Sequence, residues 1–292
     1  MFLDPVLVAF GVMAVGAIFQ KTIGFDHKNI SDLVLYVTGP ALIFVALYSH
    51  RIYASELYIL TLAAIAVMFA SGIFAFFAFS AIGYKNSGII LPSMFMNSGY
   101  LGYPVALFAL GEIGLQKAII FDTVETILLF TLGIFLVHNK GETVKGRIKA
   151  VFSLPLIYVI FLGLLFNFTA VPLPVTLIDA LSMVGSATIP LALLALGGRL
   201  VTLELAALKV PLLAVFSRIV VGGIAGFVFV KIFALEGVVA SVVLLLSVMP
   251  PAVNSYVLNE KFSADPHNAA SAVLIGTLFS IISIAAVLAA VS

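Results

Sequence analysis

Ten long apolar stretches, separated by short polar turns, run along this chain of 292 residues. A membrane-crossing helix needs roughly 20 mostly apolar residues, and each stretch is close to that length. The pattern therefore predicts an all-α membrane protein with ten transmembrane helices. Their expected ranges are 4–20, 30–49, 55–80, 87–110, 114–138, 149–168, 174–198, 206–232, 237–258 and 267–291.

Composition points to the same class of protein. The chain is 63% hydrophobic and 9% charged, whereas a soluble domain carries about 25% charged residues. The net charge of +1, without a large basic patch, argues against a nucleic-acid partner. The chain contains no Cys, which excludes thiolate metal sites, and its four His residues show no metal-ligand spacing. We therefore expect neither a metal site nor a cofactor.

Positive charges divide unequally between the two sides of the membrane. The most polar stretch, 138–149, contains Lys140, Lys145, Arg147 and Lys149, and positive charge is retained in the cytoplasm. Alternating the ten spans from this cytoplasmic linker puts ten Lys and Arg residues in cytoplasmic loops and three in outer loops. This bias predicts both termini outside. We expect the membrane to be a prokaryotic cytoplasmic (inner) membrane.

The linker separates two halves of five spans each. We expect a first repeat at 1–138, the linker at 139–148 and a second repeat at 149–292. Because five is odd, the halves would insert in opposite orientations, which is the condition for an inverted repeat. The second and seventh spans also match: Thr38 lies two residues before Pro40, Thr188 lies two residues before Pro190, and an apolar run follows each proline.

Polar runs break the fourth and ninth stretches at matching positions in the two halves. The residues of interest are Asn97, Ser98, Gly99, Tyr100 and Pro104 in the first run, and Pro250, Pro251, Asn254 and Ser255 in the second. Lipid cannot hydrogen-bond freed backbone groups, and each orphan costs several kcal/mol. Such breaks therefore persist only inside protein or beside water. Paired breaks are the best sequence pointer to the binding site of a secondary transporter.

These two breaks, together with Pro40 and Pro190 in the second and seventh spans, predict a substrate site. Proline and glycine interrupt helices, so we expect each broken span to consist of two half-helices that meet near mid-membrane. The N-terminal ends of half-helices expose N–H groups and partial positive charge, which suit an anion. Asn97 and Asn254 add neutral hydrogen bonds. The alternative interpretation is a pair of proline kinks capped by Asn and Ser, with Tyr100 and Tyr103 packed as rings.

Three charged residues fall within predicted spans. Asp122 and Glu125 lie three residues apart on one helical face, where desolvation and repulsion favour a retained proton. They are candidate proton-coupling residues, unless Asp122 lies at the headgroups or Thr126 and its neighbours supply oxygens to a sodium site. Arg218 in the eighth span is expected to pair with one of these carboxylates, to face a substrate, or to snorkel to the interface.

The run from Asn97 to Pro104 resembles the Asn-x-Gly-x-Leu-Gly-x-Pro pattern of the auxin efflux carrier family, and the segments at Pro40, Pro190 and Asn254 are similar as well. This resemblance implies a five-plus-five inverted repeat, related in fold to the bile acid sodium symporters. Spans 1, 2, 6 and 7 would form a scaffold, and the other six a moving domain in which spans 4 and 9 cross at the site. It also implies transport of organic anions such as auxin or malonate, by a homodimer.

Two details qualify the resemblance. The short central linker is typical of prokaryotic members. The sodium symporters carry an acidic residue at the ninth-span break, where this chain has Pro250 and Pro251, so sodium coupling does not carry over directly.

The sequence thus predicts an elevator-type secondary active transporter for a small organic anion, such as a carboxylate or an auxin-like acid, with proton coupling as a hypothesis. A sodium-coupled symporter, a channel and an intramembrane enzyme are the alternatives. Only the Asp122 and Glu125 pair supports an enzyme, because the motifs of intramembrane hydrolases are missing, and the chain has no P-loop for primary active transport.

Overall fold

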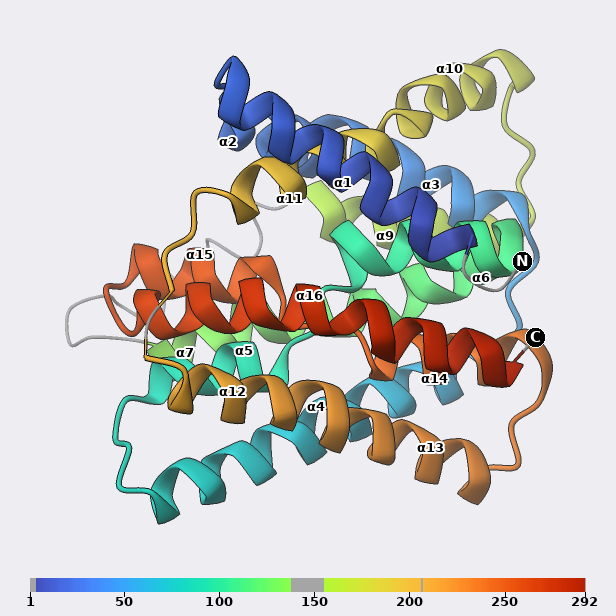
Figure 1. The fold of residues 1–292 in the computed structure, drawn as a ribbon. Coiled ribbons are helices and arrows are strands. Elements are labelled where there is room, and N and C mark those ends of the chain that lie inside the picture. Colours follow the sequence, from blue (N-terminus) through green and yellow to red (C-terminus); the bar gives the residue numbers. More distant parts are fainter. Residues whose placement is uncertain (1–3, 138–154, 206, 292) are drawn as a thin grey trace.

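A computed structural model describes residues 4–137, 155–205 and 207–291, and within these ranges the fold is built from helices without strands (Figure 1). The predicted linker at 139–148 lies outside the described residues.

In the first half, the helices are α1 (Asp4–Thr22), α2 (His27–Leu33), the π-helical turn η1 (Val34–Thr38), α3 (Gly39–Ser49), α4 (Ala54–Ala81), the 3₁₀ turn η2 (Ser87–Ile89), α5 (Ile90–Met94), the π-helical turn η3 (Ser98–Gly102), α6 (Tyr103–Leu128), the π-helical turn η4 (Leu129–Gly133) and α7 (Ile134–Val137). In the second half, they are α9 (Pro155–Thr169), α10 (Val175–Ser186), α11 (Thr188–Leu200), α12 (Lys209–Val215), the π-helical turn η5 (Phe216–Val221), α13 (Gly222–Ile232), α14 (Gly237–Ser247), α15 (Val253–Lys261) and α16 (Pro266–Val291).

Seven helical stretches within the described ranges are long and apolar enough to cross a membrane, and α9 and α14 are shorter apolar helices. One of the seven runs from 98 to 137, but Gly111 inside it has φ 70° and ψ −167°, so α6 is two helices joined at a kink. This kink falls between the predicted fourth and fifth spans. Helical residues occur in all ten predicted ranges, although length and composition alone support seven crossings.

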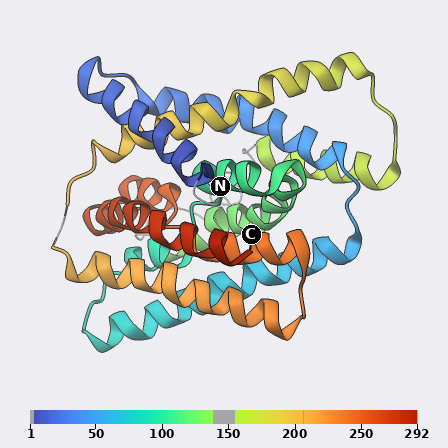
Figure 2. The same cartoon turned by 45° about the vertical axis from the view of Figure 1, so that its right-hand side comes forward.

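The helices pack as two groups, which Figures 1 and 2 show one above the other. The first helix group contains α1–α3 and α9–α11: α1 packs on α11, and α3 packs on α9 and α10. The second helix group contains α4–α7 and α12–α16, with α6 and α14 at its centre. The start of α1 and the end of α16 lie at the same end of the molecule.

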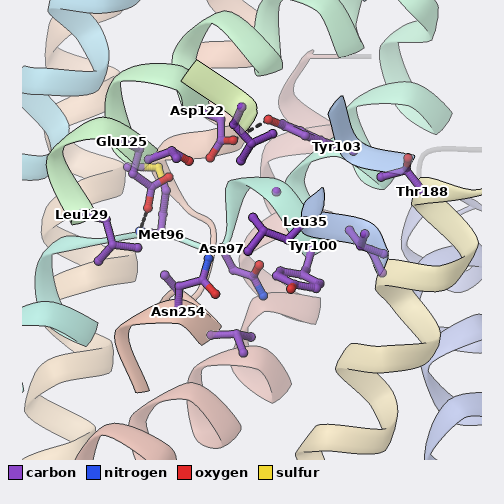
Figure 3. Close-up of a pocket in the computed structure, with 18 of the residues that line it drawn as sticks. Leu35, Met96, Asn97, Tyr100, Tyr103, Asp122, Glu125, Leu129, Thr188 and Asn254 are labelled. Atoms are coloured by element: carbon purple, nitrogen blue, oxygen red, sulfur yellow. Dashed lines mark hydrogen bonds between the residues drawn. The ribbon is translucent and has the colours of Figure 1, made fainter. Parts of the chain in front are cut away.

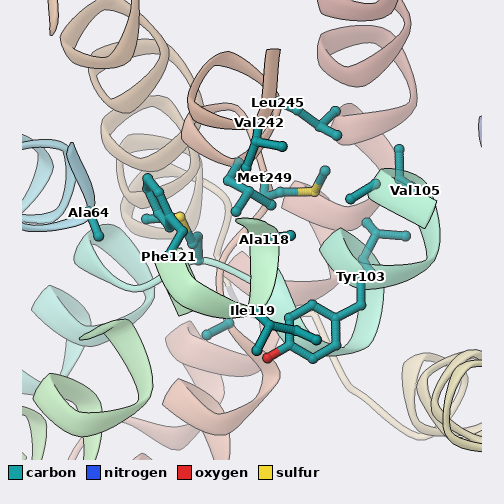
Figure 4. Packing of buried hydrophobic residues seen from close by; sticks show 14 of the residues in the cluster. Ala64, Tyr103, Val105, Ala118, Ile119, Phe121, Val242, Leu245 and Met249 are labelled. Carbon is teal, nitrogen blue, oxygen red and sulfur yellow. The ribbon is translucent and has the colours of Figure 1, made fainter. Parts of the chain in front are cut away.

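Close packing of apolar side chains holds the second helix group together. Ala118 and Phe121 of α6 and Val242 and Leu245 of α14 are fully buried beside Met249 (Figure 4). Lipid tails are as apolar as these side chains, so burial from water does not drive helix association inside a membrane. Van der Waals contact and polar bonds between helices must supply the stability instead.

The two breaks cross each other inside the second helix group. After α5 the chain is non-helical at Phe95–Asn97, and after α14 it is non-helical up to Ala252. The Asn97 N–H donates to the Pro250 carbonyl at 2.8 Å, and the Ala252 N–H donates to the Phe95 carbonyl at 2.9 Å. Met96 and Pro251 face each other as an antiparallel pair. Backbone groups freed by one break are thus satisfied by the other, as a lipid environment requires.

Arg218 stabilises one side of this crossing, its back, through hydrogen bonds. Its side chain is fully buried in η5; Nη1 donates to the Met94 carbonyl at 2.9 Å and to Ser71 Oγ at 3.1 Å, and Nη2 donates to the Ser247 carbonyl at 2.8 Å. Met94 and Ser247 are the last residues of α5 and α14, where unpaired carbonyls carry partial negative charge. One guanidinium therefore caps two half-helices.

This placement differs from the sequence expectation for Arg218. Within the described residues it makes no ion-pair contact with Asp122 or Glu125, although Glu125 lies near enough to interact with its charge, and full burial rules out snorkelling. The physical reason is that the two helix ends offer converging carbonyls, which bond both terminal nitrogens of the guanidinium in place of a carboxylate.

A second set of polar contacts joins the far ends of the half-helices. The Asn259 side-chain amide donates to the Gly88 carbonyl at 3.0 Å, and its oxygen accepts the Asp265 N–H at 3.0 Å. The Tyr84 hydroxyl donates to Asp265 Oδ2 at 2.6 Å, and burial together with this carboxylate raises the pKa of Tyr84. These contacts tie the start of α5 to the end of α15.

Replacing Arg218 tests how much the crossing depends on it. Arg218→Met fills similar volume but leaves two helix ends uncapped, so we expect the free energy of unfolding to fall by about 2–5 kcal/mol. Arg218→Lys keeps the charge with fewer donors and should lie in between. The exposed Arg51→Met is the control. Thermal unfolding in detergent measures all three; wild-type stability of Arg218→Met would show that the capping contacts are dispensable.

Candidate functional site

A cavity of about 90 Å³ lies at the front of the crossing, between the two helix groups. Both breaks and α6 line it from the second helix group, and η1, α3 and α11 line it from the first (Figure 3). The predicted site residues on its wall are Asn97, Gly99, Tyr100, Asp122, Glu125 and Asn254. Residues from both halves of the chain therefore meet at one place.

The Asn97 main chain is held in place while its side chain stays free. Its N–H bonds to Pro250, and its carbonyl accepts the Gly102 N–H at 3.0 Å. The residue is 2% exposed, and Nδ2 has no hydrogen-bond partner among the described residues. A buried amide of this kind is ready to donate to a ligand.

The two carboxyl groups of α6 lie against the first break. The Ser98 hydroxyl contacts both Asp122 and Glu125, and the Tyr103 hydroxyl donates to Asp122. The Met96 N–H donates to Glu125 Oε1 at 2.5 Å. Met96 thus bonds to α6 on the cavity side. Two residues earlier, the Met94 carbonyl accepts from Arg218 on the other side of the crossing.

The predicted prolines shape the backbone and are not on the described cavity wall. Pro104 is the second residue of α6, directly after the π-helical turn η3. Pro250 and Pro251 lie in the non-helical segment of the second break, where it crosses the first. Pro40 is buried in α3, whereas Pro190 is exposed on α11.

Ser255 also serves the backbone. Its hydroxyl donates to the Ala252 carbonyl at 2.6 Å, within the first turn of α15. It therefore helps to fix the second break rather than to line the cavity.

Sequence reasoning missed part of the wall that comes from the first helix group. Leu35 of η1 and Thr188 of α11 line the cavity. Met96, beside the first break in the second helix group, was missed as well, whereas Tyr103 was expected either to line a pocket or to pack as a ring, and it lies on the wall. The repeated Thr-x-Pro segments were a usable signal, but the threonine rather than the proline faces the site. Nothing in the apolar pattern around Leu35 indicates which side chains face a cavity.

A cation near the end of α11 links the two helix groups. The Arg199 guanidinium lies 4.8 Å from the centre of the Tyr256 ring and 3.7 Å from Glu260, both on α15. The Glu260 side chain is 57% exposed, and exposed ion pairs contribute only about 0–1 kcal/mol. This contact is weak enough to break if the groups move apart.

The site combines neutral donors, hydroxyls and two carboxyl groups in a mainly buried space. Two half-helices begin beside this cavity, one at Ser98 and one at Val253. Their N-terminal ends direct partial positive charge toward it. The arrangement therefore suits the reversible binding of a small polar molecule that carries hydrogen-bond acceptors.

Comparison with known proteins agrees with this geometry. A family model described as a membrane transport protein matches residues 2–150 and again residues 147–288. An uncharacterized transporter of Methanocaldococcus jannaschii is 30% identical over 308 aligned positions, covering 97% of this chain and 96% of the relative. An uncharacterized transporter of Methanothermobacter thermautotrophicus is 27% identical over 294 positions, covering 96% and 92%. These are membrane transporters and not enzymes. The chain is thus an integral membrane protein that belongs to the auxin efflux carrier-like family of membrane transport proteins.

Proposed function

We propose that this protein is a secondary active transporter of small organic anions that works by alternating access. The observation that carries the proposal is the crossing of two interrupted helices at a cavity lined by Asn97 and Asn254. Interrupted helices whose ends point at one mid-membrane site are the usual construction of secondary transporters.

The proposed architecture is a ten-helix, five-plus-five inverted repeat with both termini outside an inner membrane. The family model matches each half of the chain once, which supports two repeats. The antiparallel pairing of the two breaks supports halves of opposite orientation. The positive-charge bias supports the placement of the termini. A homodimer follows from the family resemblance alone, and light scattering of the purified protein tests it.

The proposed movement is of the elevator type: the second helix group slides against the first and carries the cavity with it. Two features support this. The cavity wall is shared between the groups. The Arg199 contact with Tyr256 and Glu260, which joins the groups, is weak enough to be broken in each cycle.

The proposed substrate is a small carboxylate. A buried water molecule needs about 10–15 Å³ of space, so a cavity of about 90 Å³ holds an acid of only a few heavy atoms. The partial positive charge at both half-helix starts favours an anion over a cation. In the conformation described, malonate fits this volume better than a bulky aromatic acid.

Proton coupling is proposed through the pair of carboxyl groups on α6. The Ser98 hydroxyl contacts both groups, but it carries one proton and can donate to only one of them. The second contact becomes a hydrogen bond when the other carboxyl group is protonated and donates to Ser98. A proton that enters and leaves this pair during the cycle would couple transport to a pH gradient.

Sodium coupling is the second candidate, because Asp122, Glu125 and Thr126 place oxygens on one wall of the cavity. Hard cations prefer oxygen ligands. Replacing sodium by choline in the assays below separates this candidate from proton coupling.

A ligand screen tests the proposed function. Small organic acids, including malonate and glycolate, are added to the purified protein at several pH values, with sodium or choline. A ligand at 100 times its Kd stabilises the folded state by about 2.7 kcal/mol, so binding raises the unfolding temperature. We expect a small carboxylate to do so and to support saturable counterflow in liposomes. Purely conductive flux of the same anion would instead indicate a channel.

Glu125→Gln tests the proton hypothesis. Glutamine can accept from Met96 and donate to Ser98, so it imitates the protonated acid without titrating. We expect malonate counterflow in this variant to lose its dependence on pH. The same measurement on Asp122→Asn tests whether the other carboxyl group of the pair contributes to that dependence. Glu112→Gln, at an exposed position on α6, is the control. A pH profile that is unchanged in Glu125→Gln removes this residue from the coupling scheme.

A further inference from the structure

Three buried polar groups at or beside the cavity make no hydrogen bond within the described part of the chain. They are Asn97 Nδ2, Thr188 Oγ1 and Thr38 Oγ1, and their residues are 2%, 4% and 5% exposed. Folded proteins pair nearly all such groups, because an unpaired buried hydroxyl or amide is destabilising. Three unpaired groups around one cavity require an explanation.

The three groups lie on two sides of the cavity. Asn97 lines it from the first break, and Thr188 lines it from α11 (Figure 3). Thr38 ends η1 beside Gly39, which is on the wall together with Val34 and Leu35 of the same stretch. Thr38 and Thr188 hold equivalent places in the two halves, two residues before Pro40 and Pro190.

A local distortion accompanies each free hydroxyl. Threonine in a helix usually donates to the carbonyl four residues earlier, as Thr277 does to Val273 at 2.7 Å. Thr38 instead lies at the end of a π-helical turn, and Thr188 follows an interruption at Ala187 between α10 and α11. π-helical turns are frequent at functional sites. Both hydroxyls are therefore left available rather than used within their own helix.

We propose that Asn97 and Thr188 bind opposite ends of one small acid, with Thr38 as a second hydroxyl on the Thr188 side. The acid carries its carboxylate toward Asn97 and the half-helix starts, and a second oxygen function, either a hydroxyl or a carboxyl group, toward the threonines. This inference rests on the proposed function and narrows its substrate class. The ligand then bridges the two helix groups, because Asn97 belongs to the second and Thr188 to the first.

The proposal predicts that Thr188→Val weakens ligand binding without lowering the stability of the empty protein. Valine has the shape of threonine without the hydroxyl, so Thr188→Val removes an unpaired polar group from the empty protein. We expect its unfolding temperature without ligand to equal or exceed that of the wild type. A hydroxyl that holds the fold together would show the reverse. Thr277→Val, which removes a buried hydroxyl with a partner, is the matched control and should be less stable.

Ligand binding to the full-length purified protein provides the second measurement. Glycolate and propionate differ only by a hydroxyl in place of a methyl group, and malonate offers a second carboxyl group. We expect wild type to prefer glycolate or malonate over propionate. Thr188→Val should lower the affinity for the preferred acid about tenfold, which is the loss of one hydrogen bond, and leave propionate unchanged. Thr188→Ser should retain the preference, and Asn97→Ala should weaken all three acids.

Three results would overturn the proposal. The first is that Thr188→Val and Thr38→Val each destabilise the empty protein as Thr277→Val does, which would give their hydroxyls a structural role. The second is that both variants keep the wild-type preference between glycolate and propionate. The third is that the wild type binds propionate as tightly as glycolate and malonate, which would show that no second oxygen is recognised. Binding of none of the acids would instead remove the proposed function as well, and the unfolding temperatures without ligand still decide whether the hydroxyls are free.

Discussion

The rest of this structure depends on one buried cation that holds two helix ends. Two helices that stop inside a membrane leave carbonyl groups that lipid cannot satisfy. Arg218 donates to the last carbonyls of α5 and α14, and the extended segments beyond them bond to each other. Burying a charge costs several kcal/mol, which hydrogen bonds to partially negative helix ends offset. With the backbone satisfied in this way, the chain can keep two interrupted helices at its centre.

This arrangement separates the back of the crossing from its front. Behind it, the two terminal nitrogens of Arg218 bond to Ser71 and to the Met94 and Ser247 carbonyls, and so join helices of both halves. In front of it, Glu125 bonds to Met96 and shares Ser98 with Asp122 beside the cavity. The short segment from Met94 to Met96 therefore has a fixed positive charge on one side and titratable groups on the other.

The sequence predicts much of this because the governing constraints are local. Runs of about 20 apolar residues locate the helices, and clusters of Pro, Gly and Asn locate the breaks. Asn97 and Asn254 were expected at the substrate site, and Asp122 and Glu125 were expected as coupling residues in the neighbouring span; all four lie on the cavity wall. The partners of Arg218 were not foreseeable, because two backbone carbonyls from distant segments leave no trace in residue identity. Leu35 and Thr188 were missed for a related reason: they belong to helices that reach the cavity only through tertiary packing.

Among the buried asparagines and threonines that the structure describes, the pattern of hydrogen-bonded and unbonded groups distinguishes structural from functional polar side chains. Asn259 and Asn97 are both buried asparagines beside a half-helix, yet Asn259 bonds through both side-chain atoms while the Asn97 amide nitrogen bonds to nothing described. Thr277 and Thr188 form a similar contrast. Selection for stability alone would replace the unpaired members by apolar residues of the same shape. Their presence at one cavity, on both faces of the sliding contact that we propose, is most simply explained by a ligand that completes their hydrogen bonds.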